Sequence, residues 1–203
     1  MSGRSFPDIV LASASTTRLR ILEAAGITVL VEPSQVDERP VKVKLAATRV
    51  RAESVATTLA ELKSVSVSRI RIDALVIGAD QVLEFEGRIY DKPGTRDAAK
   101  RQLRELRGRK HRLITAASLA SAGEIVWRHL ETASLTMRVF SDSFLDAYLD
   151  RAGDDVLGSV GAYHIEGLGA QLFSKVEGDH YVIRGLPLWP LLDRLRQAGA
   201  IAS

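Results

Sequence analysis

The sequence predicts an α/β protein, and three stretches of the chain carry that prediction. Residues 74–77, Ala-Leu-Val-Ile, form a short apolar run of the kind that lies buried inside a sheet. Residues 8–26 follow the pattern of a strand, a hydroxyl-rich turn and a helix. The apolar pair Val82-Leu83 precedes a predicted hairpin turn at Glu86-Gly87. Helical and strand patterns that alternate in this way predict a sheet flanked by helices.

Length and composition bound the number of domains and the class of protein. At 203 residues the chain can bury one good core, or two small lobes that share one. We find no repeat, low-complexity segment or linker, and therefore expect a single domain over residues 1–203. The absence of cysteine excludes disulfides, thiolate zinc sites and a cysteine nucleophile. No apolar run approaches the ~20 residues that span a bilayer, so we expect a cytoplasmic protein without a membrane partner.

The first helix is predicted to begin at an anion-binding turn. Residues 8–13 predict a strand, Ser15 is the natural N-cap of the next helix, and Gly26 closes that helix. Free N–H groups and the positive end of the dipole attract anions at such a turn. Arg18 lies in the first helical turn, where a cation opposes the dipole, which suggests that it serves another purpose. A plain serine cap beside a surface arginine is the alternative.

Residues 27–68 place an acidic pair after a predicted strand and a lysine late in a predicted helix. Residues 27–31 predict a strand, and the acidic pair Asp37-Glu38 follows in a loop bounded by prolines. Residues 45–68 predict a helix with one apolar face, and Lys63 lies near the end of that pattern. The alternatives are solvated loop acids and a lysine that complements the helix dipole.

Asp80 and Lys92 are the first candidates for chemistry. The buried strand is predicted to end at Gly78, so that Asp80 follows its carboxyl end, where open α/β sheets place their ligands. Lys92 precedes Pro93 at the base of the predicted hairpin, where it could neutralise an anionic substrate. The alternatives are an acid that caps a turn and a lysine on a solvated loop.

The second half of the chain predicts further strands and helices. The predicted elements are a helix from Thr95 to Arg107, strands over 111–122 and 125–139 (the latter one long strand or two short ones), a helix from Ser141, strands over 172–176 and 181–183, and a last helix closed by Gly199. The glycine-dense segment 158–169 contains Glu166 and would let the backbone approach a ligand closely. The helical arginines lack interleaved aromatic residues, so we interpret them as a solvated face and expect no nucleic-acid partner.

Motifs distributed over nearly the whole chain resemble those of the Maf family. The matching stretches are LASAS at 11–15 with Arg18 and AGI at 25–27, VDE at 36–38, LAELKS at 59–64, GADQV at 78–82, DKP at 91–93, the GRxH pattern at 108–111, GAYHIEGLGA at 161–170 and GLPL at 185–188. The resemblance implies a Maf/ITPase-like fold, in which a twisted mixed sheet is flanked by helices and two lobes surround a central cleft. It also implies a homodimer.

The activity implied by this resemblance is that of a nucleoside triphosphate pyrophosphatase. Such an enzyme hydrolyses the bond between the α and β phosphates and yields a nucleoside monophosphate and pyrophosphate, with Mg²⁺ or Mn²⁺ as cofactor. Asp80 would accept the proton of the attacking water, with Glu38 as its acidic partner, and both would bind the metal. Lys63 and Lys92 would neutralise the phosphates. The residues implied for triphosphate binding at the helix N-terminus are Ser13, Ser15 and Arg18.

Three positions bear on the choice of base. Gln81 and Glu166 resemble the branch of the family that implies cleavage of 7-methyl-GTP. N7-methylguanine carries a positive ring charge and presents two adjacent N–H donors, and a carboxylate suits both. Thr17 stands where that branch usually has tryptophan, so a stacking partner is missing. Glu166 could also be a loop acid that satisfies backbone donors, and Ser64 departs from the alanine usual after the family's lysine.

Three other functions remain as alternatives. The first is a dTTP or UTP pyrophosphatase. The second is a non-enzymatic nucleotide-binding regulator of septum formation, which would not need a base at Asp80. The third is a nucleic-acid-binding protein, suggested by the basic isoelectric point, whose affinity would fall steeply with salt.

Overall fold

The computed structural model describes residues 7–47 and 50–202. Within these residues the chain forms a seven-stranded sheet in the order β2-β1-β3-β5-β6-β7, with β4 paired to β3. The strands are β1 (Ile9–Leu11), β2 (Leu30–Val31), β3 (Leu75–Phe85), β4 (Arg88–Tyr90), β5 (Lys110–Ser121), β6 (Glu124–Met137) and β7 (Phe173–Glu177). Pairing of β1 with β2 and β3 is parallel, whereas β3–β4 and β6–β7 are antiparallel. The prediction of a mixed sheet flanked by helices is therefore confirmed.

The helices alternate with these strands along the chain. They are α1 (Thr16–Ala24), α2 (Glu38–Ala47), α3 (Ala52–Ser68), α4 (Arg96–Leu106), α5 (Asp142–Ala152), α6 (His180–Ile183) and α7 (Leu188–Gln197), with two 3₁₀ turns, η1 (Asp154–Gly158) and η2 (Leu168–Leu172). In the described residues no helix is long and apolar enough to cross a bilayer.

The chain divides into two compact units. The first comprises residues 1–80, 115–131 and 185–203, and the second comprises 81–114 and 132–184. Strands β3, β5 and β6 contribute residues to both units. A single domain over the whole chain stays a prediction.

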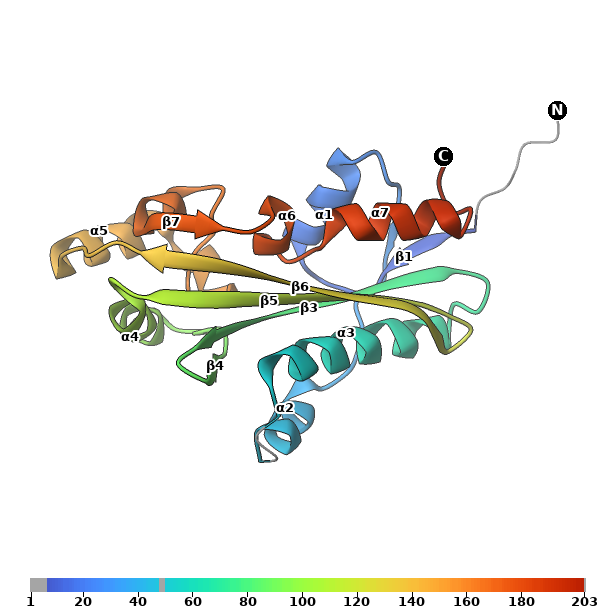
Figure 1. The fold of residues 1–203 in the computed structure, drawn as a ribbon, viewed down its shortest axis with the longest axis horizontal. Helices are drawn as coiled ribbons and strands as arrows, with labels where there is room; N and C mark the ends of the chain where they lie inside the picture. The colour runs from blue at the N-terminus through green and yellow to red at the C-terminus, as the bar shows by residue number, and fades with distance from the viewer. Residues whose placement is uncertain (1–6, 48–49, 203) are drawn as a thin grey trace. The chain divides into compact units, whose positions relative to one another are not determined.

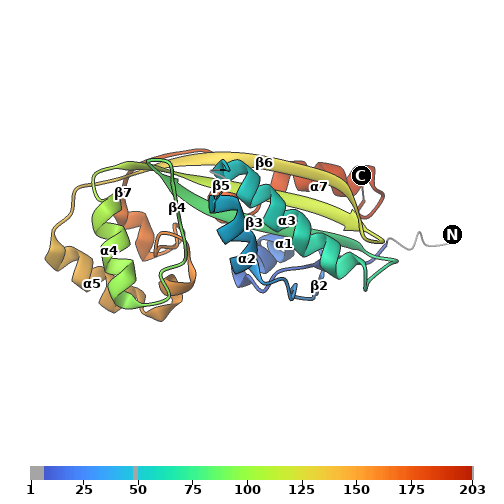
Figure 2. The ribbon, with the colours of Figure 1, turned by 90° about the horizontal axis from the view of Figure 1, so that it is seen from below.

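The first unit is layered around its part of the sheet. Helix α3 covers one face, while α1 and α7 lie on the opposite face (Figure 1). Seen from below, α3 lies in front of the strands and α7 behind them (Figure 2). A small cluster of buried side chains lies between α3 and the sheet, and it contains Val10, Ala12, Val67, Ala74 and Val76. This packing attaches α3 to the strands that carry the predicted site.

The second unit contains a large apolar cluster. Its members include Leu83, Leu103, Leu135, Leu145 and Leu172, all fully buried. Helices α4 and α5 begin at serine and threonine caps as predicted, because Thr95 accepts from the Ala98 N–H and Ser141 accepts from the Phe144 N–H.

Strand β3 corrects the predicted end of the buried strand at Gly78. The strand continues from Leu75 to Phe85, so Asp80 lies inside it. The parallel partner β1 pairs only as far as Ile77, and Asp80 follows the end of that parallel ladder. Glycine at position 78 accommodates the backbone of α3 and does not end the strand. The predicted hairpin turn is confirmed, with Glu86 at φ 51° between β3 and β4.

Several other boundaries differ from the predictions, among them that of the strand expected over 27–31, which is limited to Leu30–Val31. Glu38 is the first residue of α2 and not a loop residue, because Pro40 is tolerated in a first turn, where an N–H has no helical partner. The helix expected over 45–68 begins at Ala52, since Arg51 has an extended backbone; its residues 48–49 lie outside the described residues. Residues 181–183 belong to α6 and not to a strand, because the Asp179 carboxylate accepts from the N–H groups of residues 181 and 182.

His111 gives the second unit a pH-dependent stability. It is 1% exposed, and its Nε2 is hydrogen bonded to the Tyr163 hydroxyl at 2.8 Å. Burial lowers the pKa of His111 from 6.5 to about 4. The unfolded chain therefore takes up a proton below pH 6.5, whereas the folded chain stays neutral until about pH 4. Stability is fully present above pH 6.5 and falls as the pH drops toward 4.

We expect the free energy of unfolding to fall by about 2 kcal/mol between pH 7.5 and pH 5 because of this histidine. Denaturant titrations at the two pH values measure that loss. Glutamine in His111→Gln keeps a hydrogen-bonding group near Tyr163 and does not titrate. The loss of stability between the two pH values should therefore be about 2 kcal/mol smaller in this variant than in the wild type. Equal losses in the two proteins would contradict the assignment.

Candidate active site

The turn between β1 and α1 is held by two serine hydroxyls. Ser15 is the N-cap, and its Oγ accepts the N–H of Arg18 at 3.3 Å. The Oγ of Ser13 accepts the N–H of Ser15 at 3.2 Å, and Ser13 is buried. The predicted cap is confirmed, and the hydroxyls fix the first turn of the helix before any ligand is present.

Arg18 is enclosed by the first unit and is not a surface arginine. Its Nε donates to the Gly185 carbonyl at 2.8 Å, and its Nη1 donates to the Ala79 carbonyl at 2.9 Å and to Ser13 Oγ at 3.1 Å. Burial lowers the pKa of Arg18, and the charge of Asp80 acts against that shift. The guanidinium thus joins the serine turn, β3 and the loop before α7 into one structure.

Lys63 joins the two predicted carboxylates. Its Nζ lies 2.6 Å from Oδ1 of Asp80 and 2.7 Å from Oε1 of Glu38. The Lys63 side chain is 12% exposed and that of Asp80 is 10% exposed, so this ion pair is largely removed from water. Lys42, one helical turn after Glu38, lies 3.4 Å from its other oxygen. Residues predicted from three separate motifs therefore meet around one ammonium group.

Gly78 sets the distance between α3 and β3. A Cβ at this position would overlap the Ala60 carbonyl oxygen and would lie 2.7 Å from the backbone nitrogen of Ser64. The Ser64 hydroxyl is hydrogen bonded to that of Ser118 on β5 at 2.8 Å, and both residues are fully buried. The missing side chain of Gly78 and the hydroxyl of Ser64 hold α3 close to the sheet, which brings Lys63 to Asp80.

The pKa values of the two carboxylates are shifted in opposite directions by burial and the neighbouring lysines. Burial raises the pKa of Asp80 above its ordinary value, although the Lys63 charge opposes the shift. Burial also acts to raise the pKa of Glu38, but the hydrogen bond and charge of Lys63, with help from Lys42, outweigh it and leave that pKa lowered. A carboxylate with a raised pKa is the better proton acceptor of the two.

The donor set is compatible with a divalent cation. In the described residues no three His, Cys, Asp or Glu side chains converge on one point. Glu38 and Asp80, however, each place an oxygen within 2.7 Å of the same cationic nitrogen. Magnesium is commonly held by one or two carboxylates, with water and substrate phosphates completing its shell. Two converging carboxylates therefore fit a metal that is completed by the substrate.

The remaining predicted residues fall in other environments. Thr17 is half-buried in the first turn of α1. Lys92 is exposed in the second unit, where Gln81 and Glu166 also lie. Their placement beside the cluster around Lys63 stays a prediction.

Sequence reasoning missed Arg184. Its Nε lies 3.4 Å from Oε1 of Glu166, so the predicted specificity residue has a cationic partner. The Nε2 of Gln81 donates to the carbonyls of Val182 and Ile183, at 2.9 and 3.1 Å. The only signal in the sequence was an arginine directly before the GLPL motif.

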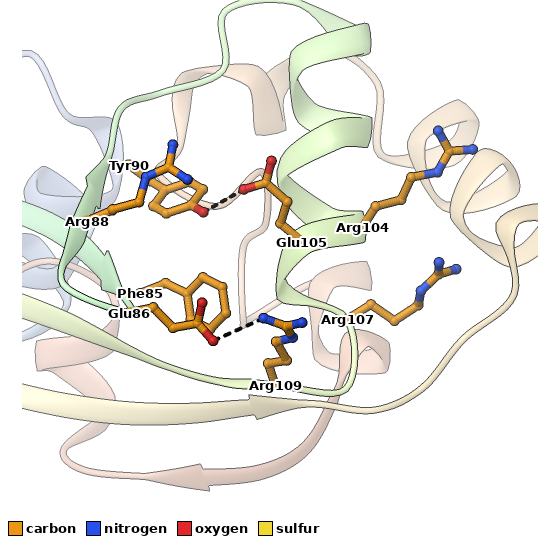
Figure 3. Close-up of a pocket in the computed structure, with 8 residues that line it drawn as sticks. All are labelled: Phe85, Glu86, Arg88, Tyr90, Arg104, Glu105, Arg107 and Arg109. Atoms are coloured by element: carbon orange, nitrogen blue, oxygen red, sulfur yellow. Dashed lines mark hydrogen bonds and ion pairs between the residues drawn. The ribbon is translucent and has the colours of Figure 1, made fainter.

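The second unit also contains a hollow of about 460 Å³ outside these residues (Figure 3). It is lined by Phe85, Glu86, Arg88, Tyr90, Arg104, Glu105, Arg107 and Arg109. Arg109 pairs with Glu86 at 3.0 Å, while Arg104 and Arg107 both pair with Asp142. Three of the four arginines that line this hollow therefore pair with acids.

Comparison with known proteins identifies the family. The Maf-like protein family model matches residues 8–198. The chain is 52% identical to a nucleoside triphosphate pyrophosphatase of Paramagnetospirillum magneticum, over 95% of this chain and 99% of that protein. It is 45% identical to a 7-methyl-GTP pyrophosphatase of Rhizobium meliloti, over 96% of this chain and 98% of that protein. A full-length match of this kind, together with the motifs now placed around Lys63, means that the chain belongs to the Maf family.

Proposed function

We propose that this protein is a nucleoside triphosphate pyrophosphatase that cleaves the bond between the α and β phosphates. The observation that carries the proposal is the Lys63 ammonium held between Asp80 and Glu38, beside the half-buried Arg18. The relatives named nucleoside triphosphate pyrophosphatase and 7-methyl-GTP pyrophosphatase support the same activity. Among substrates we favour 7-methyl-GTP, which the names of several relatives support.

The cluster can activate water next to a phosphate. In the proposed reaction a water oxygen adds to the α phosphorus, the bond from that phosphorus to the bridging oxygen breaks, and pyrophosphate leaves. Asp80 accepts the proton of the water, a role that its raised pKa favours. Lys63 donates to the developing negative charge on the phosphate oxygens.

The charge balance of the cluster explains why a metal would help. Arg18 and Lys63 offset Glu38 and Asp80, which leaves little net charge for a triphosphate that carries about four negative charges. Mg²⁺ or Mn²⁺ held by Glu38 and Asp80 would supply the missing positive charge and polarise the phosphates. Lys92 would supply a further positive charge from the second unit.

Pyrophosphate release from dTTP, UTP, CTP, GTP and 7-methyl-GTP tests the proposal. We expect turnover of one or two of these with Mg²⁺ or Mn²⁺, highest for 7-methyl-GTP. EDTA should lower it by at least ~10²-fold, because the cluster alone cannot neutralise the triphosphate. A pyrimidine triphosphate as the best substrate would favour the dTTP/UTP alternative. Tight nucleotide binding without any pyrophosphate release would favour the regulator.

The homodimer is a separate proposal. It rests on the resemblance to the family alone. Light scattering coupled to size-exclusion chromatography would give the mass of the assembly, and a mass near 22.1 kDa would identify a monomer.

A further inference from the structure

Glu166, Gln81 and Arg184 are connected through the short helix α6. Gln81 donates its amide to the last carbonyls of that helix, at residues 182 and 183. Arg184 caps the helix, and its own N–H donates to the His180 carbonyl at 3.2 Å. The arginine that pairs with Glu166 therefore follows the same short helix that holds the Gln81 amide.

The loop that carries Glu166 is fixed by its own turn. The N–H of Gly167 donates to the His164 carbonyl at 3.2 Å. A Cβ at Gly169 would overlap that carbonyl oxygen, so only glycine lets the chain close this tightly. The glycine at position 169 thus serves the loop itself, and Glu166 stands on a closed turn.

The buried Nε of Arg184 has no hydrogen-bond acceptor among the described residues. Its side chain makes the ion pair with Glu166 at 3.4 Å, a distance and geometry that leave its buried Nε without a hydrogen bond in the part of the chain described. The side chain is 19% exposed, and that of Glu166 is 35% exposed. A guanidinium presents five N–H donors in one plane. A buried N–H without an acceptor is a costly arrangement, and it shows that the contacts within the described residues do not use the full hydrogen-bonding capacity of this guanidinium.

The Watson–Crick edge of guanine complements this pair. That edge presents the O6 acceptor beside the N1 and N2 donors, and a carboxylate with an adjacent guanidinium offers the opposite pattern. Adenine presents an amino donor where guanine has O6, and would face the arginine with a donor. A carboxylate alone would select a base by its N1 and N2 donors, whereas the pair of Glu166 and Arg184 would also select for the O6 acceptor.

We propose that Arg184 is a base-reading residue, which donates to O6 of a guanine-type base while Glu166 accepts from N1 and N2. The inference rests on the proposed pyrophosphatase activity and deepens it. It assigns the substrate to 2-amino-6-oxopurine nucleoside triphosphates. Because Arg184 offsets the charge of Glu166, the positive ring charge of a 7-methyl base adds less to binding than it would beside a lone carboxylate.

The test compares substrates with and without O6. Pyrophosphate release is measured for 7-methyl-GTP, GTP and 2-aminopurine riboside triphosphate, which keeps the N2 amino group but lacks both O6 and the N1–H. Arg184→Leu should raise KM for GTP by about 10- to 100-fold with little change in kcat, since a hydrogen bond to a charged group is lost. For the substrate without O6 the variant and the wild type should have similar KM values.

Two further variants separate base reading from general damage. Arg184→Lys keeps a cationic donor and should recover part of the affinity for GTP. Arg96→Leu removes an arginine that pairs with Asp150 in the same unit, and should leave every KM unchanged. The ratio of kcat/KM for 7-methyl-GTP over GTP should also rise in Arg184→Leu, because Glu166 then faces the base without its cation.

The outcomes distinguish this inference from the proposed function. If wild-type protein releases no pyrophosphate from any nucleotide, the pyrophosphatase assignment is wrong. If the wild type is active but Arg184→Leu raises KM equally for substrates with and without O6, Arg184 does not read the base. If Arg184→Leu changes neither KM nor the ratio, the ion pair serves only the loop.

Discussion

Asp80→Asn is expected to lower pyrophosphate release by about 10³-fold while nucleotide binding survives. A general base contributes roughly 10²- to 10⁴-fold to such reactions. Asparagine keeps an oxygen that can accept from Lys63, whose Nζ lies 2.6 Å from the aspartate in the native protein. Lys63 also keeps its contact with Glu38 at 2.7 Å, so the cluster should hold its shape.

Binding and turnover are measured separately in this experiment. Calorimetry with an α,β-methylene triphosphate, which cannot be cleaved at that bond, reports affinity, and pyrophosphate release reports turnover. In a titration without metal, removing a negative charge beside the triphosphate should leave the affinity equal or higher. The matched control is Asp193→Asn on α7, because within residues 7–47 and 50–202 the ion pair of Asp193 is with Arg196 on its own helix.

Either of two results would overturn the role of Asp80. Turnover that remains near the wild-type level would remove Asp80 as the base. Loss of affinity together with turnover would mean that the carboxylate serves mainly to hold Lys63. In that second case the thermal midpoint of the variant should also fall.

Features set by neighbouring residues could be predicted from the sequence. Ser15, Thr95 and Ser141 each cap a helix as expected, because a cap needs only a hydroxyl and the N–H groups three residues ahead. The hairpin at Glu86 could be predicted for the same reason, because a tight turn is set by the residues within it. The motif resemblance supplied the site residues, since the order of motifs in a chain does not depend on its fold.

Contacts between distant segments could not be predicted in this way. No local rule indicated that one lysine joins acids from α2 and β3, or that Arg184 pairs with a residue in the glycine-rich loop. Asp179 looked like part of a turn between strands, yet its side chain starts α6. Each case depends on which backbone N–H or carboxylate another segment brings within reach, and that is decided by tertiary packing.

Gly78 illustrates the same limit, because its importance lies in what packs against it. In the sequence it resembled the end of a strand, whereas in the fold it is where α3 touches β3. The atoms nearest to a Cβ at this position belong to the backbone of Ala60 and to Ser64. A side chain can rotate away from a new methyl group, but a helix backbone has to move as a whole.

Gly78→Ala should therefore destabilise the protein by about 3 kcal/mol and reduce turnover by at least ~10²-fold. Retreat of α3 carries Lys63 away from Asp80, and a misplacement of about 1 Å is enough for that loss of rate. Denaturant titration and pyrophosphate release measure the two effects. Gly158→Ala is the control for stability, because a Cβ there meets no atom within 4 Å.

A double variant tests whether the helix backbone sets this approach. Adding Ser64→Ala should not rescue Gly78→Ala, since the Ala60 carbonyl remains in place. Full recovery in the double variant would show that the Ser64 side chain, and not the helix backbone, sets the approach of α3.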